Sequence, residues 1–268
     1  MQLAYKKLGQ GSPLLILHGL YGSSDNWYSI GKEIAKQHEV FLLDMRNHGK
    51  SAHSNDHDYS YMQADILEFL HTHQIKKASI IGHSMGGKTA MLFALLHPEF
   101  INKLIIVDIA PKSYTSLQNY QLHALEHLNI MQAFLSVDIS TLKSRNEIDS
   151  EFAKYVPDSS TRMFLLKNVA RTNEGFSWIL NVAILSKSLP NILEGINTKA
   201  GITKGNECFP TLFIKGEKSD YILDSDLHSI KQLFPKAELT TIFDAGHWVH
   251  SEQPILFLKA VNYFLDRE

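Results

Sequence analysis

The chain has 268 residues, of which 44% are hydrophobic, and its formal net charge is −2 at pH 7. This balance, without long runs of like charge, argues against a nucleic-acid surface and against an electrostatic membrane tether. A single cysteine, Cys208, excludes an intrachain disulfide, and no apolar run is long enough to span a bilayer. No apolar signal core stands at the N-terminus, so we expect a soluble cytoplasmic protein with one large domain that carries an insertion.

The first part of the chain alternates apolar runs with stretches of helical periodicity. The expected strands are 2–8, Pro13–Leu17, Val40–Asp44, Ala78–Ile81 and Lys103–Val107, and the expected helices are Trp27–Lys36, Tyr61–His73 and Met85–Leu96. Continuous apolar strands that alternate with helices are typical of a mostly parallel, doubly wound α/β sheet covered on both faces.

Two of the expected helices have sequence signals for their first residue. Asp25 or Ser24 is expected to cap the first helix, because side-chain oxygens of this kind accept hydrogen bonds from free backbone N–H groups. Ser60 and Gln63 have the spacing of a capping box at the start of the second helix.

The alternation stops between residues 112 and 205, where apolar residues recur only at helical spacing. Helices are expected at Leu117–Val137, Phe152–Tyr155, Arg162–Arg171 and Phe176–Ser186. Strands at Thr211–Lys215 and Ala237–Phe243 and helices at Asp224–Phe234 and Ile255–Leu265 then resume the first pattern. The sequence therefore predicts an α/β core of residues 1–111 and 206–268. Residues 112–205 are expected to form a helical cap inserted after the strand that ends at Asp108; the simpler alternative is a plain helical extension of the core.

A Gly-x-Ser-x-Gly pattern occupies residues 82–86, with Ser84 in its middle. An expected strand leads into the pattern and an expected helix leads out of it. In this context the pattern forms a tight turn that lifts a serine nucleophile above the carboxyl edge of the sheet. The pattern is short, so the alternative is an ordinary turn with a solvent-facing serine.

Candidate partners of Ser84 follow later strands of the same sheet. Asp108 and His247 come after it in the chain, and nucleophile, acid, base is the order found in enzymes with this serine turn. An imidazole titrates near neutral pH, so it can take the serine proton and return it to a leaving group. His250 is the rival base, but His247 stands directly at the end of the expected strand.

The acid has two candidates. In folds of this kind the carboxylate usually stands in the loop after the strand that ends at Gly216, and the usual spacing falls on Ser219. Asp220 comes one residue later, which turns its side chain elsewhere unless the loop is reshaped. We therefore favour Asp108, one strand after the nucleophile, with Asp220 as the alternative.

Backbone N–H groups are expected to hold the negative charge that develops on the substrate oxygen. By position these groups belong to Leu20 and Met85, so their side chains matter little. His18 is expected to brace the loop that carries Leu20. The polar run at residues 46–48 is expected to be a structural hydrogen-bonding loop beside the site.

Five motifs together give a resemblance that extends along the whole chain. They are residues 18–23 (His-Gly-Leu-Tyr-Gly-Ser), 44–49 (Asp-Met-Arg-Asn-His-Gly), 82–88 (Gly-His-Ser-Met-Gly-Gly-Lys), 107–111 (Val-Asp-Ile-Ala-Pro) and 246–250 (Gly-His-Trp-Val-His). With these motifs the chain resembles the α/β-hydrolase superfamily, and within it the bacterial serine esterases. The resemblance implies a cofactor-free esterase or thioesterase with Ser84, His247 and Asp108 as its catalytic residues. It also implies acyl-ester substrates, acyl-CoA thioesters among them.

The sequence thus favours a serine carboxyl-ester hydrolase that acts on a small-molecule acyl ester or thioester. A carbon–carbon bond hydrolase or a lyase on the same fold is the first alternative, and a non-catalytic small-molecule receptor is the second. An aspartate nucleophile is disfavoured because position 84 is serine. We expect no metal, because the 14 histidines are scattered without convincing ligand spacing. The sequence does not predict an oligomeric state.

Overall fold

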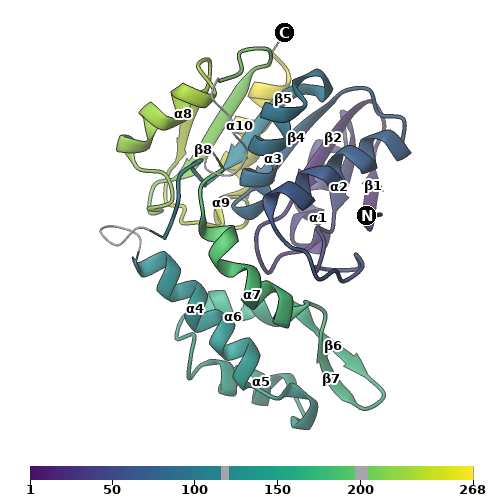
Figure 1. Cartoon of the computed structure of the whole chain (residues 1–268), viewed down its shortest axis with the longest axis vertical. Helices are drawn as coiled ribbons and strands as arrows, with labels where there is room; N and C mark the ends of the chain where they lie inside the picture. Colours follow the sequence, from purple (N-terminus) through teal and green to yellow (C-terminus); the bar gives the residue numbers. More distant parts are fainter. Residues whose placement is uncertain (116–120, 197–204, 268) are drawn as a thin grey trace.

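The computed structural model describes residues 1–115, 121–196 and 205–267 (Figure 1). Within these residues a seven-stranded sheet has the strand order β1-β3-β2-β4-β5-β8-β9. The strands are β1 (Tyr5–Leu8), β2 (Ser12–Leu17), β3 (His38–Leu43), β4 (Ala78–His83), β5 (Ile101–Val107), β8 (Thr211–Gly216) and β9 (Glu238–Ile242). β1 pairs antiparallel with β3, and the other pairs are parallel. The expected mostly parallel α/β sheet is confirmed, with β1 as a short edge strand.

Helices cover both faces of this sheet. They are α1 (Tyr28–Ile34), α2 (Tyr59–Thr72), α3 (Met85–Leu96), α8 (Leu227–Leu233), α9 (Val249–Glu252) and α10 (Pro254–Leu265). Successive residues of β2 alternate between the two layers: Leu14 and Ile16 pack in the cluster formed with α1 and α10, whereas Leu15 and Leu17 pack in the cluster formed with α2 and α3. Burial on both faces explains why these strands have no polar alternation.

Residues 121–196, between β5 and β8 in the chain, form a lobe beside the sheet, at the lower end of Figure 1. Its elements are α4 (Gln121–Ser136), α5 (Arg145–Phe152), α6 (Ser159–Leu165), β6 (Val169–Thr172), β7 (Gly175–Trp178) and α7 (Val182–Leu193). We call residues 121–196 the inserted segment. Its aromatic side chains pack together; the rings of Phe134 and Trp178, for example, lie 4.7 Å apart.

The expectation that this segment is entirely helical is wrong at β6 and β7, which pair as an antiparallel hairpin. The helix expected at Arg162–Arg171 ends at Leu165, and the one expected at Phe176–Ser186 begins only at Val182. The reason is the turn before β7, where Gly175 has φ of 133°, a conformation that L side chains rarely adopt. A hairpin then buries Val169 and Phe176 on one side.

Two further helix boundaries of this segment differ from expectation. The short helix expected at Phe152–Tyr155 is instead α5, which ends at Phe152, because Ser144 accepts a hydrogen bond from the N–H of Glu147 and starts the helix earlier. The helix expected at Leu117–Val137 is present from Gln121 to Ser136, and residues 117–120 lie outside the described residues.

The expected capping box at α2 is wrong. Asp58 is the N-cap, and its carboxylate accepts a hydrogen bond from the N–H of Tyr61 at 3.0 Å. The extended backbone of Asp58, with φ of −147°, allows the chain to enter the helix one residue before Ser60. Gln63 instead contacts the His97 ring at 3.1 Å.

The first helical turn is a 3₁₀ turn at Ser24–Trp27, and its N-cap is Ser23 rather than Ser24 or Asp25. The N–H of Ser23 donates to the Asn26 side chain at 2.7 Å, which completes a local capping arrangement.

Across the described part of the chain, no helix combines the length and the apolar character needed to cross a membrane.

Candidate active site

Ser84 lies between β4 and α3 with φ of 51° and ψ of −117°. A non-glycine residue in this region of the backbone map stores about 1–3 kcal/mol of strain, which the surrounding packing must hold in place. Glycines make the turn possible: a Cβ atom on Gly82 would lie 2.4 Å from the carbonyl oxygen of Gly86, and one on Gly86 would lie 2.4 Å from that of Leu17. The expected tight serine turn therefore matches the observed backbone, and Ser84 stands at the carboxyl edge of the sheet.

Asp108 follows β5 at the same edge and is completely buried. One of its oxygens, Oδ1, accepts a hydrogen bond from the N–H of Gly216 at 2.9 Å. The other, Oδ2, lies 2.8 Å from Nδ1 of His247, and the hydroxyl of Ser219 donates to this same oxygen. The carboxylate thus has three hydrogen-bond partners, and one of them is the imidazole.

Burial raises the pKa of Asp108 to about 7, although the hydrogen bonds from Ser219 and Gly216 lower it. Burial also lowers the pKa of His247 to about 3. Because the two groups share a hydrogen bond, they titrate as a pair that takes up its first proton near pH 7. Above that pH, Nδ1–H of the neutral imidazole donates to the carboxylate, and the lone pair on Nε2 is free to accept a proton.

The alternative acid and the rival base lie elsewhere. Asp220 is exposed, and within the described residues it makes no hydrogen bond or ion pair with His247. His250 is buried with its ring stacked on Trp27, the centroids 3.8 Å apart. The structure therefore brings His247 to Asp108 and leaves His250 in the apolar layer beneath the site.

Ser84 and His247 line one cavity of about 150 Å³ between the sheet edge and the inserted segment. In the described part of the chain no hydrogen bond joins the Ser84 hydroxyl to the His247 ring, and such catalytic contacts often tighten only when substrate binds. The lining residues are Gly19, Leu20, Tyr21, His83, Ser84, Glu126, His127, Ile130, Thr161, Phe164, Leu165, Tyr221, His247, Trp248 and Glu252.

The N–H groups of Leu20 and Met85 are available beside Ser84, because neither donates to another residue in the described chain. Leu20 lines this cavity, and Met85 lines a small adjoining hollow together with Leu20 and Ser84. His18 holds the loop that carries Leu20 in place. Its Nε2 accepts a hydrogen bond from the N–H of Met45 at 3.0 Å, so Nδ1 carries the proton and donates to the carbonyl of Gly19 at 2.8 Å. The bracing role expected of His18 agrees with these contacts.

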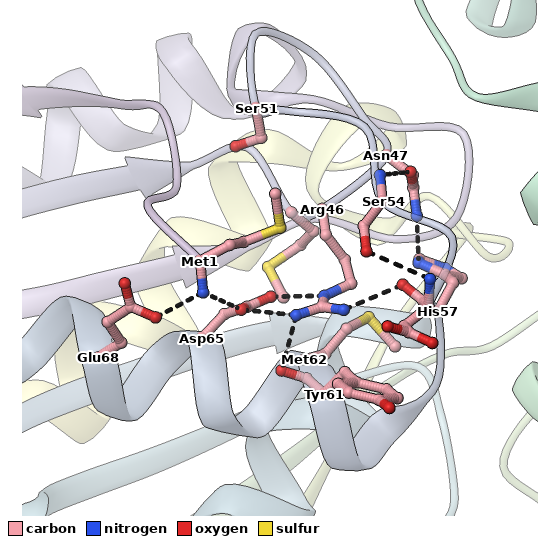
Figure 2. A network of polar contacts seen from close by, with 12 residues as sticks. Met1, Arg46, Asn47, Ser51, Ser54, His57, Tyr61, Met62, Asp65 and Glu68 are labelled. Atoms are coloured by element: carbon pink, nitrogen blue, oxygen red, sulfur yellow. Dashed lines mark hydrogen bonds and ion pairs between the residues drawn. The ribbon is translucent and has the colours of Figure 1, made fainter.

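Arg46 and Asn47 lie in a buried polar network, which Figure 2 shows, and His48 is buried too. The guanidinium of Arg46 donates to both oxygens of Asp65, at 2.6 and 2.7 Å. Asn47 Oδ1 accepts from the N–H of Ser54 at 2.8 Å, and His48 Nε2 accepts from a backbone N–H of the loop after β2 at 3.3 Å. These contacts agree with the structural role expected from the sequence.

Sequence reasoning missed the residues that surround His247. The Tyr221 ring stacks on the His247 ring with centroids 3.8 Å apart, and its hydroxyl lies 3.3 Å from Nε2 of His127. The other nitrogen of His127 lies 3.3 Å from the hydroxyl of Tyr21. His127 belongs to α4, so the inserted segment is linked to both walls of the cavity. Helical periodicity alone gives no signal for this position.

Glu252 fixes the backbone on either side of His247. One carboxylate oxygen accepts from the N–H of Gly246 at 2.7 Å, and the other accepts from the N–H of Trp248 at 3.0 Å. The position of Glu252, five residues after His247, could have indicated this role. A carboxylate one turn into a helix commonly accepts hydrogen bonds from the free N–H groups at the helix start.

The described residues hold no group of three or more histidine, cysteine and acidic side chains that could bind a metal ion. Cys208 is a free, exposed thiol.

A sequence profile described as the alpha/beta hydrolase fold matches residues 12–254. The chain belongs to the α/β-hydrolase family. A solved structure titled marine microorganism esterase superposes with a TM-score of 0.92 and is 43% identical, covering 98% of this chain and 99% of that one.

Two curated relatives extend the comparison. Esterase YbfF of Escherichia coli is 33% identical over 255 residues, which cover 95% of this chain and 93% of the relative. The sn-1-specific diacylglycerol lipase ABHD11 of Danio rerio is 36% identical over 264 residues, which cover 96% of this chain and 79% of the relative. The resemblance expected from the five motifs is confirmed, including the likeness to a bacterial esterase.

Proposed function

We propose that the protein is a serine carboxyl-ester hydrolase in which Ser84 is the nucleophile, His247 the general base and Asp108 the acid that orients the base. The observation that carries the proposal is the 2.8 Å contact between His247 Nδ1 and Asp108 at the cavity that Ser84 lines. The expectation that the chain is an enzyme of the ester-hydrolase class is confirmed by the family match and by relatives named as esterases and a lipase.

The reaction follows from the roles of these groups. His247 Nε2 takes the proton of the Ser84 hydroxyl as its oxygen attacks the acyl carbon, and Asp108 stabilises the imidazolium that forms. The N–H groups of Leu20 and Met85 donate to the oxyanion, and a single donor of this kind is worth about 2.7–4 kcal/mol. His247 then gives the proton to the leaving alcohol, and water releases the acyl group from Ser84 by the same steps.

We further propose that residues 112–205 act as a cap on a hydrolase core of residues 1–111 and 206–268. Supporting this, side chains of α4 and α6 line the cavity together with the sheet edge. Covering the site in this way excludes water and strengthens electrostatic interactions within it. Residues 116–120 and 197–204, near the two ends of the proposed cap, lie outside the described residues.

The size of the cavity favours short acyl esters. Its volume of about 150 Å³ is similar to that of an engineered protein cavity that holds benzene. A long acyl chain would have to extend beyond it. Thioester substrates stay a prediction from the resemblance, and the cytoplasmic location stays a prediction from composition.

Hydrolysis of p-nitrophenyl esters from acetyl to palmitoyl tests the proposal. We expect the rate to peak at short chains and to fall by about 10⁵–10⁶-fold in Ser84→Ala, as it does when a triad serine is removed. Ser150→Ala, at an exposed position in α5, is the matched control and should keep wild-type rates. Activity retained in Ser84→Ala would refute the mechanism. No signal at any chain length would favour the carbon–carbon hydrolase or lyase alternative.

A further inference from the structure

Acidic side chains, but no lysine or arginine among the described residues, line the cavity that contains Ser84. Among the described residues around it, two side chains are carboxylates, Glu126 and Glu252, and none is a lysine or an arginine. The histidines there have a lowered pKa because of burial, so they are neutral near pH 8. From the described residues, a substrate in this cavity therefore meets negative charge and no formal positive charge.

The two carboxylates differ in how their charge is compensated. Glu252 accepts hydrogen bonds from two backbone N–H groups, as described above. For Glu126, no hydrogen bond or ion pair with another described residue is found, although its side chain reaches both solvent and the cavity. Burial raises the pKa of Glu126, and the nearby carboxylate of Asp158 raises it further. The charge of Glu126 thus has no counter-ion in the described protein.

Aromatic rings form much of the remaining wall. Tyr21, Phe164 and Trp248 line the same cavity as Glu126, and the rings of Phe164 and Trp248 lie 5.1 Å apart, whereas the Tyr221 ring is already stacked on His247. The faces of aromatic rings attract cations, and quaternary ammonium groups are bound by sites of this composition. Aromatic walls around an uncompensated carboxylate are therefore suited to a positively charged group on the substrate.

A buried lysine lies nearby but does not change this balance, because burial lowers the pKa of Lys88 to about 7. Its Nζ lies over the Tyr114 ring, 4.7 Å from the ring centroid, and donates to the carbonyl oxygens of Leu193 and Glu194. The hollow between Lys88 and Ser84 is about 20 Å³, room for roughly one water molecule. A carboxylate or phosphate on the substrate does not fit there.

From these observations we propose that Glu126 makes the enzyme select esters with a cationic group, such as a trimethylammonium, over neutral and anionic esters of the same shape. The inference rests on the proposed function, because it concerns the substrate of the same cavity. The sequence left both simple esters and acyl-CoA thioesters open as substrates. Because acyl-CoA thioesters are strongly anionic, the proposal disfavours them.

The test compares substrates that differ only in charge. Acetylcholine and its neutral isostere 3,3-dimethylbutyl acetate differ in the charge of the alcohol part. Ethyl 4-(trimethylammonio)butyrate and its neutral isostere ethyl 5,5-dimethylhexanoate differ in the charge of the acyl part. We expect kcat/KM at pH 8 to favour the cation over its neutral isostere by roughly tenfold in at least one pair, and less at high salt, as for a partly hydrated charge pair.

The readout is the ratio of kcat/KM for the cationic ester to kcat/KM for its neutral isostere, measured with the same protein. A substitution that changes the activity on both esters equally leaves this ratio unchanged. In Glu126→Gln the ratio should fall toward one, and in Glu126→Lys it should reverse. Glu174→Gln, at an exposed position in the turn before β7, removes the same charge away from the cavity and should keep the wild-type ratio.

Two failures are distinguishable. If the neutral esters are hydrolysed but neither pair shows a ratio that depends on Glu126, the inference is wrong and the proposed function stands. If none of the four esters is hydrolysed in a Ser84-dependent reaction, the proposed function itself is wrong.

Discussion

The hydroxyl of Ser219 donates a hydrogen bond to the carboxylate oxygen of Asp108 that also contacts His247. Ser219 follows β8, at the position where the sequence pattern leads one to expect the acid itself. In this chain the carboxylate is instead Asp108, at the end of the neighbouring strand β5, and the usual position of the acid is occupied by the hydroxyl donor Ser219. The donor stabilises the charged form of a fully buried carboxylate, which would otherwise be costly to ionise.

Removing this donor should change the pH dependence of the reaction. In Ser219→Ala, Asp108 loses a hydrogen bond that lowers its pKa, so the carboxylate becomes protonated at higher pH. We expect kcat to fall about tenfold, the usual worth of a hydrogen bond to a charged group. The acid limb of kcat/KM against pH should move to higher pH. Ser219→Thr keeps the donor and should restore the limb; an unchanged limb in Ser219→Ala would contradict the role.

The two candidate acids can be ranked by the same amide substitution. Asp108→Asn should lower kcat by about 10⁴-fold, because an amide can hold the imidazole in the wrong tautomer. Asp220→Asn should stay close to wild type, since Asp220 is exposed and does not contact His247. Circular dichroism and thermal unfolding check that both variants fold. The reverse ranking would overturn the assignment of Asp108.

The pH profile of the wild-type enzyme should have its acid limb near pH 7. The Asp108–His247 pair takes up its first proton there, because burial raises the pKa of the carboxyl to about 7. Once protonated, Asp108 no longer provides the negative charge that stabilises the imidazolium of His247, so kcat/KM falls as the pH decreases and reaches a plateau above pH 7. Steady-state rates from pH 4 to 9 on a neutral ester measure this; full activity at pH 5 would contradict it.

The elements that could be predicted from the sequence are those with one dominant physical signal. Runs such as Leu14 to Leu17 are apolar at every position, which only a strand buried on both faces requires. Ser84, Asp108 and His247 each follow such a strand, and the carboxyl ends of parallel strands meet at one edge. The strand pattern therefore also predicted the group of residues at the candidate site.

The remaining parts depend on contacts between segments distant in sequence. β7 is short and aromatic, so its helical and strand signals are similar, and the turn at Gly175 with the packing of Trp178 decides the outcome. The periodicity of α4 predicts a helix but not that His127 faces the cavity. Ser219 was noticed only as a missing acid, because its role as a donor depends on a carboxylate from another strand.

The buried Arg46–Asp65 pair should contribute strongly to stability. Arg46→Met leaves the Asp65 carboxylate buried, and among the described residues only the Met1 ammonium, 2.8 Å away, remains as a charged partner. Breaking a buried pair costs about 3–5 kcal/mol, so we expect a loss near the lower limit in urea unfolding. The control is Arg267→Met, whose pair with Glu238 is about half exposed and should contribute about 0–1 kcal/mol. Equal losses at the two sites would contradict the importance of burial.

Glu252 should act on catalysis through the loop that carries His247. Glu252→Gln keeps the size of the side chain but replaces one acceptor oxygen with an NH₂ group, which faces the N–H of Gly246 or Trp248 instead of accepting from it. We expect kcat to fall about tenfold with little change in KM, because a small displacement of a positioned group impairs the chemical step more than binding.

The matched control for this substitution is Glu238→Gln, since Glu238 is exposed on β9 and pairs only with Arg267 among the described residues. It removes the same charge and should keep wild-type kcat. A lowered kcat in Glu252→Gln with an unchanged acid limb and an unchanged melting temperature would indicate misorientation of His247 rather than loss of the fold or of the Asp108 contact. A rise in KM at constant kcat would instead place Glu252 in substrate binding and contradict its role in holding the loop.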